Sequence, residues 1–133
     1  MKIVEISTVP GISSISAGFP SPAEDFSEPS ISLDKYLIKH PMATFMAYVN
    51  GDSMIDAEIY HKDILIIDRS LNAKNDDIII AILNGEFIVK KLSIIGNIFH
   101  LISSNKECES IQITLDMKFE IWGVVIASIK KFR

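Results

Sequence analysis

Apolar residues are scattered before about residue 30 and gather into dense runs after it. The later runs are rich in Ile, Val and Phe and are separated by Gly, Asn and Asp, a pattern typical of β-strands joined by turns. Asn84-Gly85 separates two of these runs and predicts a tight hairpin, because this dipeptide readily adopts the positive φ angles of such a turn. The pattern predicts a mainly β domain of several small twisted sheets, with strands over 44–49, 64–68, 78–83, 86–92, 98–103, 111–115 and 119–129.

One short helix is predicted just before the first of these strands. Leu33, Tyr36 and Leu37 are spaced so that they share one helical face. Ser32 is a suitable N-cap, since its hydroxyl oxygen can accept a hydrogen bond from a backbone N–H of the first turn. Pro41 marks the end of this segment, because proline cannot continue a helix.

Residues 1–30 are predicted to form an extended N-terminal arm, and residues 31–133 the β-rich domain. Prolines recur through the arm, and each removes a backbone donor and restricts the residue before it, so no long helix can form there. Within the arm, residues 15–20 have small side chains at the centre and apolar ones on either side. We expect this stretch to fit a narrow cleft in extended form.

The composition indicates a globular protein and limits what it binds. Of 133 residues, 48% are hydrophobic, and the formal net charge is −4. An acidic chain lacks the basic surface that binds nucleic acid, so we expect a protein partner and no strong direct DNA binding. Apolar runs such as residues 78–83 are too short to cross a bilayer, and the N-terminus lacks the form of a signal peptide. We therefore expect a soluble, cytoplasmic protein with no membrane partner.

Neither a metal nor another cofactor is expected. The single cysteine, Cys108, rules out an intrachain disulfide and a cysteine-built metal cluster. The chain also lacks HxxxH and CxxC motifs and a glycine-rich phosphate loop.

A polar turn after the first predicted strand contains a candidate nucleophile, Ser53. Gly51 would let a substrate strand approach closely, and backbone N–H groups near Ser53, with Gly51, Asp52 and Met54 as support for the turn, could stabilise an oxyanion. The structural alternative is an ordinary turn, because Gly, Asp and Ser all favour turns for backbone reasons.

Lys90 is the candidate base that would activate this serine. Side chains alternate along the predicted strand 86–92, so Ile88 and Leu92 flank Lys90 on one face while Lys91 points to the other. Burial disfavours the ammonium form of a lysine, and a neutral amine can take the proton from a serine hydroxyl. The structural alternative is that both lysines lie on an exposed edge and discourage edge-to-edge pairing.

Ser53 and Lys90 together make a Ser-Lys dyad the leading hypothesis. A triad of Ser53, His61 and an aspartate is the histidine-based alternative, although nothing in the spacing selects it. His40 precedes a proline and His100 lies in a predicted strand, so neither points to a site.

Several motifs in one order resemble the UmuD-like group of the LexA-type self-cleaving serine peptidases. The resemblance covers nearly the whole chain from residue 17 onward and is carried by residues 17–23 (AGFPSPA), 51–56 (GDSMID), 63–68 (DILIID), 84–92 (NGEFIVKKL) and 123–126 (GVVI). It implies Ser53 as the nucleophile, Lys90 as the general base and Ala17-Gly18 as the scissile bond. The arm is shorter than is usual in that group, and Asn75-Asp76-Asp77 stands where glycine usually precedes aspartate.

The resemblance also implies partners in the bacterial SOS response to DNA damage. In that family, RecA filaments on single-stranded DNA act as co-protease and stimulate a chain to cut its own arm. The product, residues 18–133, would form a homodimer and serve a UmuC-type Y-family DNA polymerase in error-prone lesion bypass. Two alternatives stay open: a catalytically silent β-rich interaction module, and a soluble signal-peptidase-like Ser-Lys protease that acts in trans.

Overall fold

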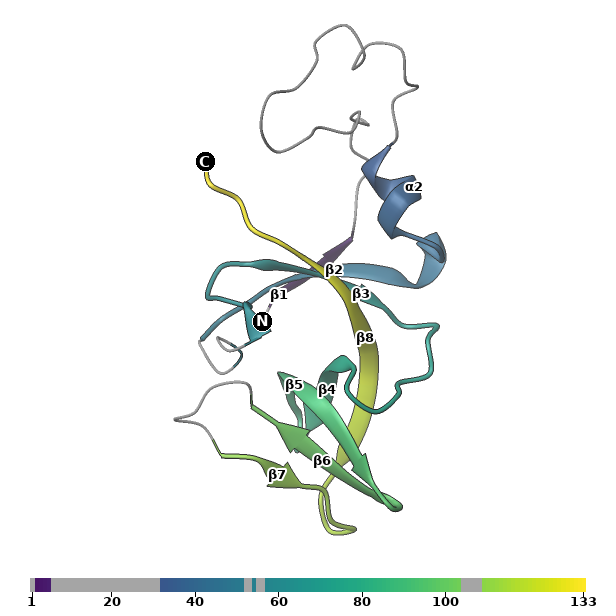
Figure 1. Ribbon diagram of the computed structural model, residues 1–133, viewed down its shortest axis with the longest axis vertical. Helices are drawn as coiled ribbons and strands as arrows, with labels where there is room; N and C mark the ends of the chain where they lie inside the picture. Colours follow the sequence, from purple (N-terminus) through teal and green to yellow (C-terminus); the bar gives the residue numbers. More distant parts are fainter. Residues whose placement is uncertain (1, 6–31, 52–53, 55–56, 104–108) are drawn as a thin grey trace, which may run out of the picture.

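The computed structural model of the protein describes residues 2–5, 32–51, 54, 57–103 and 109–133. Within these residues the strands are β1 (Lys2–Glu5), β2 (Thr44–Tyr48), β3 (Ile64–Asp68), β4 (Ile78–Leu83), β5 (Glu86–Ile95), β6 (Ile98–Ile102), β7 (Ile111–Gln112) and β8 (Phe119–Ile129). They form one eight-stranded sheet in the order β1-β2-β3-β8-β4-β5-β6-β7 (Figure 1). Every pairing is antiparallel.

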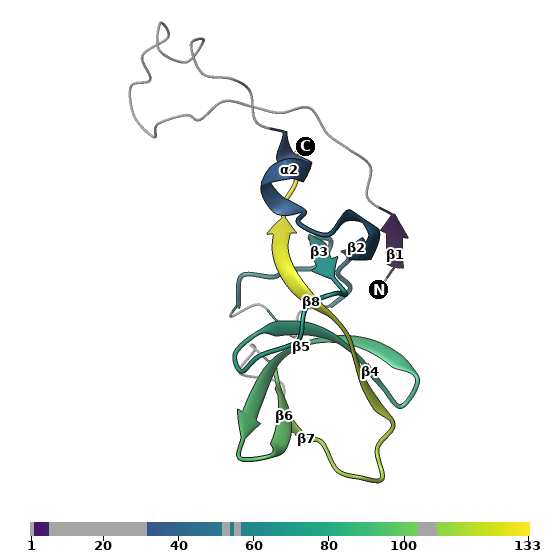
Figure 2. The same cartoon turned by 90° about the vertical axis from the view of Figure 1, so that its right-hand side faces the viewer.

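The predicted mainly β class with one short helix is confirmed, but the strands form one continuous sheet where we expected several small ones. The long strand β8 makes the difference, because it pairs with β4 along its first half and with β3 along its second. Figure 2 shows β8 curving from the β4–β7 part of the molecule to the part that holds β2 and β3. Register shifts in β3 and β4 accompany this curvature.

Gly123 allows β3 to pack closely on β8. A Cβ atom at this position would lie 2.5 Å from Ile67 Cγ2 and 3.3 Å from Arg69 Cγ. The same residue pairs with Ile80 in β4, so it lies where both halves of the sheet meet β8. A larger residue here would push the two halves apart.

The hydrophobic core consists of two clusters that share β4. Ile80 belongs to a cluster with Met54 and Leu65, whereas Ile79 belongs to a second cluster with Leu92. Both Ile79 and Ile80 are fully buried. A strand with both faces buried is apolar throughout, which explains the uninterrupted run of residues in β4.

The hairpin predicted at Asn84-Gly85 is confirmed, because both residues have positive φ, 50° and 87°. β5 continues past its predicted end to Ile95 and pairs with β6 across a second tight turn. β7 is shorter than predicted. The reason is a local turn in which the Thr114 hydroxyl donates to Asp116 and the Thr114 carbonyl accepts the Met117 N–H.

The short helix α2 (Leu33–Leu37) begins as predicted, with the Ser32 hydroxyl oxygen accepting the Lys35 N–H at 3.3 Å. Pro41 opens a 3₁₀ turn, η1 (Pro41–Ala43), that leads into β2. None of the helices among the described residues has the length and apolar character needed to span a membrane.

Part of the predicted arm is a strand, since β1 pairs with β2 from Lys2 opposite Tyr48 to Glu5 opposite Phe45. Residues 6–31 lie outside the described residues. The division into an arm over 1–30 and a domain over 31–133 therefore stays a prediction.

Candidate active site

The two stretches singled out in the sequence meet at one pocket. Gly51 and Met54 line it from the turn after β2, and Lys90 lines it from β5. The cavity volume is about 130 Å³. Asp52 and Ser53 lie outside the described residues, so the structure places only their neighbours Gly51 and Met54. Ala17 and Gly18 also lie outside the described residues. The other lining residues that the structure describes are Val49, Asn50, Phe87, Ile88 and Val89.

Met54 anchors the turn immediately after Ser53. Its side chain is 2% exposed and belongs to the first core cluster, against which Val89 of β5 also packs. Its carbonyl accepts the N–H groups of Ala57 and Ile59, each at 3.1 Å. Met54, which follows the candidate nucleophile, and Val89, which precedes Lys90, thus pack in the same core cluster.

Gly51 holds the other end of this turn and has φ of +96°, a conformation that favours glycine. Its N–H donates to Nδ1 of His61 at 3.2 Å, so this ring nitrogen acts as an acceptor. The structure therefore brings His61 next to the turn. Because Nδ1 is occupied, only Nε2 could serve as a base in the histidine alternative.

Lys90 is partly buried and its Nζ donates a hydrogen bond to Ser103 Oγ at 2.7 Å. Ile88 and Leu92, on either side of it, both pack in the second core cluster. Lys91 has a different environment, since its Nζ lies 3.9 Å from Asp76 Oδ1 at the surface, where its side chain is 41% exposed. The two adjacent lysines thus differ in both location and partners.

Ser103 was missed in the sequence analysis, although the chain contains a signal for it. β5 and β6 pair with Lys91 opposite Ile102 and Leu92 opposite Leu101, and this register carried one residue further sets Lys90 opposite Ser103. The register follows from the tight turn at Gly96-Asn97, a dipeptide typical of two-residue hairpin loops.

The turn at residues 75–77 supports β5 just beyond Lys90. The Asp76 N–H donates to the Leu92 carbonyl, and the Leu92 N–H donates to the Asp77 carbonyl, both at 2.8 Å. Asp76 has φ of +74°, a conformation in which glycine is favoured. This turn therefore keeps the geometry that glycine permits even though aspartate occupies the position.

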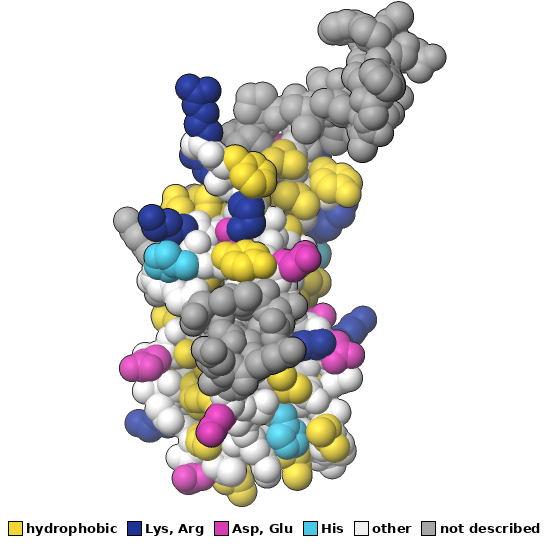
Figure 3. Space-filling view, turned by 60° about the vertical axis from the view of Figure 1, so that its left-hand side comes forward, with side chains coloured by type: hydrophobic (Ala, Val, Ile, Leu, Met, Phe, Trp, Pro, Cys, Tyr) yellow, Lys and Arg dark blue, Asp and Glu magenta, His cyan; other side chains and the backbone are white. Residues whose placement is uncertain are grey.

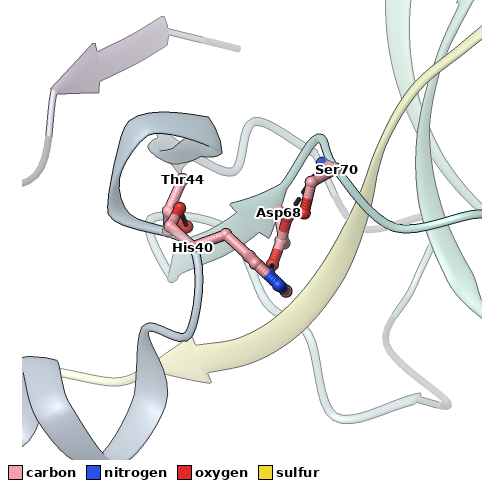
Figure 4. Close-up of polar contacts among 4 residues, drawn as sticks. All are labelled: His40, Thr44, Asp68 and Ser70. Atoms are coloured by element: carbon pink, nitrogen blue, oxygen red, sulfur yellow. Dashed lines mark hydrogen bonds and ion pairs between the residues drawn. The ribbon is translucent and has the colours of Figure 1, made fainter.

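A second polar cluster lies at the end of β3 and is shown in Figure 4. Asp68 is 2% exposed, and its Oδ2 lies 2.6 Å from His40 Nδ1. The backbone N–H and the hydroxyl of Ser70 donate to Oδ1 at 2.8 and 2.6 Å. Burial raises the pKa of Asp68, but the hydrogen bonds from Ser70 and His40 outweigh it and hold the pKa below the usual 3.8.

Asp63 is the other buried carboxylate among the described residues. Its Oδ1 accepts from Lys130 Nζ at 2.8 Å and its Oδ2 from the Tyr60 N–H at 2.9 Å. Burial raises the pKa of Asp63, but these two bonds and the charge of Lys130 together lower it by more. The net shift of the pKa is therefore downward. The second bond is local, so Asp63 also closes the turn that leads into β3.

Charged residues elsewhere on the surface are mixed in sign. On the face shown in Figure 3, the Lys and Arg side chains are interspersed with Asp and Glu. Over the described ranges, the Cys, His, Asp and Glu side chains form no group of three that could hold a metal ion.

The chain belongs to the Peptidase S24-like family, a family of serine peptidases, whose model matches residues 10–126. It is 40% identical to the protein MucA of Salmonella typhimurium over 116 residues, covering 86% of this chain and 79% of MucA. It is 37% identical to the protein SamA of the same species over 117 residues, or 88% of this chain and 81% of SamA. The protein ImpA of Shigella flexneri is 45% identical over 76 residues, which span 57% of this chain and 52% of ImpA. The predicted relationship to UmuD-like peptidases is confirmed.

Proposed function

We propose that the chain is a self-cleaving serine endopeptidase that cuts its own Ala17-Gly18 bond with a Ser53/Lys90 dyad. One observation carries the proposal: Gly51 and Met54, which flank Asp52-Ser53, line the same pocket as Lys90. Membership of a serine peptidase family supports it, since such a family needs a serine with a base beside it.

In the proposed reaction, the neutral Lys90 amine takes the hydroxyl proton of Ser53 as its Oγ attacks the Ala17 carbonyl carbon. The resulting ammonium gives that proton to the nitrogen of Gly18 as the C–N bond breaks, which leaves Ala17 esterified to Ser53. Water then attacks the ester with Lys90 again as base. The products are a free carboxylate on Ala17 and a free amino group on Gly18.

A substrate on the same chain suits a small pocket. Tethering gives the arm a high effective concentration, so weak binding of the cleavage site is sufficient. Small residues at positions 17 and 18 offer little hindrance to attack. Each molecule would react once, so the reaction acts as a one-way switch.

The partners follow from the resemblance to the UmuD-like group. A RecA filament on single-stranded DNA would stimulate the cut in the bacterial cytoplasm. The product, residues 18–133, would act as a homodimer and as accessory subunit of a UmuC-type Y-family polymerase. No direct strong contact with DNA is needed for this role, which suits the net charge of −4.

The test is intact-mass spectrometry of the full chain after incubation with RecA, single-stranded DNA and a nucleoside triphosphate. We expect a product that begins at Gly18, and we expect the Ser53→Ala variant to yield none. A wild-type chain that stays intact while a known RecA-stimulated peptidase is cut in the same mixture would instead support a silent interaction module.

A dilution series separates self-cleavage from cleavage in trans. For an arm cut within its own chain or its own stable dimer, the first-order rate constant is independent of protein concentration. A rate constant that rises in proportion to concentration would support the signal-peptidase-like alternative.

A further inference from the structure

We propose that Ser103 is the positioning residue for Lys90, accepting one of its N–H groups and thereby directing the amine into the pocket. This inference rests on the proposed role of Lys90 as the base. It concerns the residue that directly follows β6, outside the five motifs on which the sequence resemblance was based.

The geometry of the contact is that of a strong hydrogen bond. Nζ of Lys90 lies 2.7 Å from Oγ of Ser103, in a partly buried position. Lys90 lies in β5 and Ser103 directly follows the adjacent antiparallel strand β6. The register of the two strands, carried one residue beyond Lys91 opposite Ile102, sets Lys90 opposite Ser103. The pairing of Ile102 with Lys91 therefore holds the backbone next to Ser103 in place, independently of the Lys90 side chain.

The Ser103 hydroxyl has a second partner that fixes its direction. It donates to the carbonyl of Glu109 at 3.4 Å, at the long end of hydrogen-bond distances. With its hydrogen directed there, Oγ presents lone pairs to Lys90 and acts as the acceptor. Lys90 must then be the donor in this pair.

The chemistry of a lysine base explains why such an acceptor is needed. A neutral amine has two N–H bonds and one lone pair on a flexible four-carbon stem. A hydrogen bond through one N–H restricts the stem and confines the lone pair to a narrow range of directions. The lone pair is then available to the Ser53 hydroxyl for more of the time.

The same contact affects protonation. An acceptor oxygen favours the ammonium form over the amine, so the hydroxyl raises the pH at which Lys90 loses its proton. Loss of the hydroxyl should therefore lower the maximal cleavage rate and also shift the midpoint of its pH profile downward. A residue with only a structural role would not produce this combination.

The experiment measures self-cleavage of the full chain from neutral to alkaline pH without co-protease, so that the pH dependence of RecA does not contribute. For Ser103→Ala we expect a maximal rate about tenfold lower, because a misdirected base loses alignment with its target. The pH midpoint should fall as well. Ser103→Thr keeps the hydroxyl and should restore the rate to within about twofold of the wild type. Ser110→Ala, the same change at an exposed serine, is the control and should leave the profile unchanged.

A second readout does not depend on cleavage. In the Ser53→Ala background, ¹³C NMR of the Lys90 Cε follows the titration of this lysine directly, and Ser103→Ala should move its midpoint to lower pH. If the wild type cleaves but both the cleavage profile and the NMR titration are unchanged by Ser103→Ala, the positioning role is wrong. If the wild type produces no Gly18 fragment under any condition, the proposed function itself fails, whatever the NMR titration shows.

Discussion

The pocket cluster of Lys90 and Ser103 and the β3-end cluster of His40, Asp68 and Ser70 use similar residues in different ways. Each joins an ionisable side chain to a serine hydroxyl, with contacts of 2.7 Å in the first and 2.6 Å in the second. In the β3-end cluster, the imidazole and the hydroxyl are both bonded to the carboxylate between them. In the pocket cluster, the lysine also lines a cavity that it shares with the turn around Ser53.

The difference lies in the order of the bonds and in access to a cavity. A catalytic triad needs the histidine between the serine and the aspartate, so that it can take the proton of the serine. In the β3-end cluster the aspartate occupies that middle position and is 2% exposed. The contacts therefore tie the end of β3 to the segment before β2, and we assign this cluster to stability and the pocket cluster to chemistry.

The largest effect on stability is expected from Asp68→Ala. Removal of this buried carboxylate leaves His40 and Ser70 without their partner and opens a small cavity, which should lower the free energy of unfolding by about 3 kcal/mol. Self-cleavage, measured at a temperature where the variant is still folded, should stay close to the wild-type rate. Urea denaturation and the cleavage assay check the two halves of this prediction. A large loss of cleavage in a well-folded Asp68→Ala protein would show that the clusters are not independent.

Acid should weaken the β3-end cluster. The pKa of Asp68 is lower in the folded chain than its usual 3.8, so the carboxylate stabilises the fold above that pH. This contribution is lost as the pH falls below 3.8 and through the folded-state pKa, because protonation then becomes more favourable in the unfolded chain. Thermal unfolding over this acid range should show a steeper decline for the wild type than for Asp68→Asn, which cannot titrate. Because the pKa of Asp63 is also lowered, both proteins should lose some stability in acid. An equally steep decline in the two proteins would contradict the role of Asp68 in stability.

Lys90→Met should change stability much less. Methionine keeps a similar unbranched stem between Ile88 and Leu92 and removes a partly buried polar group, so the free energy of unfolding should stay within about 1 kcal/mol of the wild type. A loss of several kcal/mol in urea denaturation would indicate that the lysine has a structural role instead.

Lys91→Ala is expected to have the smallest effect. Its ion pair with Asp76 is exposed and long, at 3.9 Å, and such pairs contribute at most about 0.5 kcal/mol. Urea denaturation of this variant should therefore overlay that of the wild type, and a clearly lower midpoint would show that Lys91 packs more tightly than its exposure indicates.

Features set by neighbouring residues were predicted well. The Ser32 cap, the Asn84-Gly85 hairpin and the bounds of β3, β4 and β8 depend on local turn chemistry and on the alternation of side chains. The expectation that the aliphatic neighbours of Lys90, Ile88 and Leu92, share one face of β5 has the same origin, because it required only the period of a strand.

Features that join distant segments could not be predicted in this way. The continuous sheet depends on how β8 divides its pairing between β3 and β4, and the contact of His40 with Asp68 spans 28 residues. The left-handed backbone conformation of Asp76 could not be predicted from the sequence, because hydrogen bonds between its turn and β5 impose it. The contact of Ser103 with Lys90 is intermediate between local and distant features. It joins two strands, but the Gly96-Asn97 turn between them sets the register and could have been recognised in the sequence.

Self-cleavage of the wild type, Lys90→Met and Lys91→Met, measured side by side with RecA filaments, is the most direct test of the dyad. The two variants carry the same substitution at adjacent positions on opposite faces of β5, so they differ only in which lysine is lost. We expect Lys91→Met to release the fragment that begins at Gly18 at nearly the wild-type rate. Lys90→Met should be slower by at least about 1,000-fold, as is usual when the base of a nucleophilic serine is removed. Cleavage of Lys90→Met at the wild-type rate would contradict the dyad and point to His61 as the base.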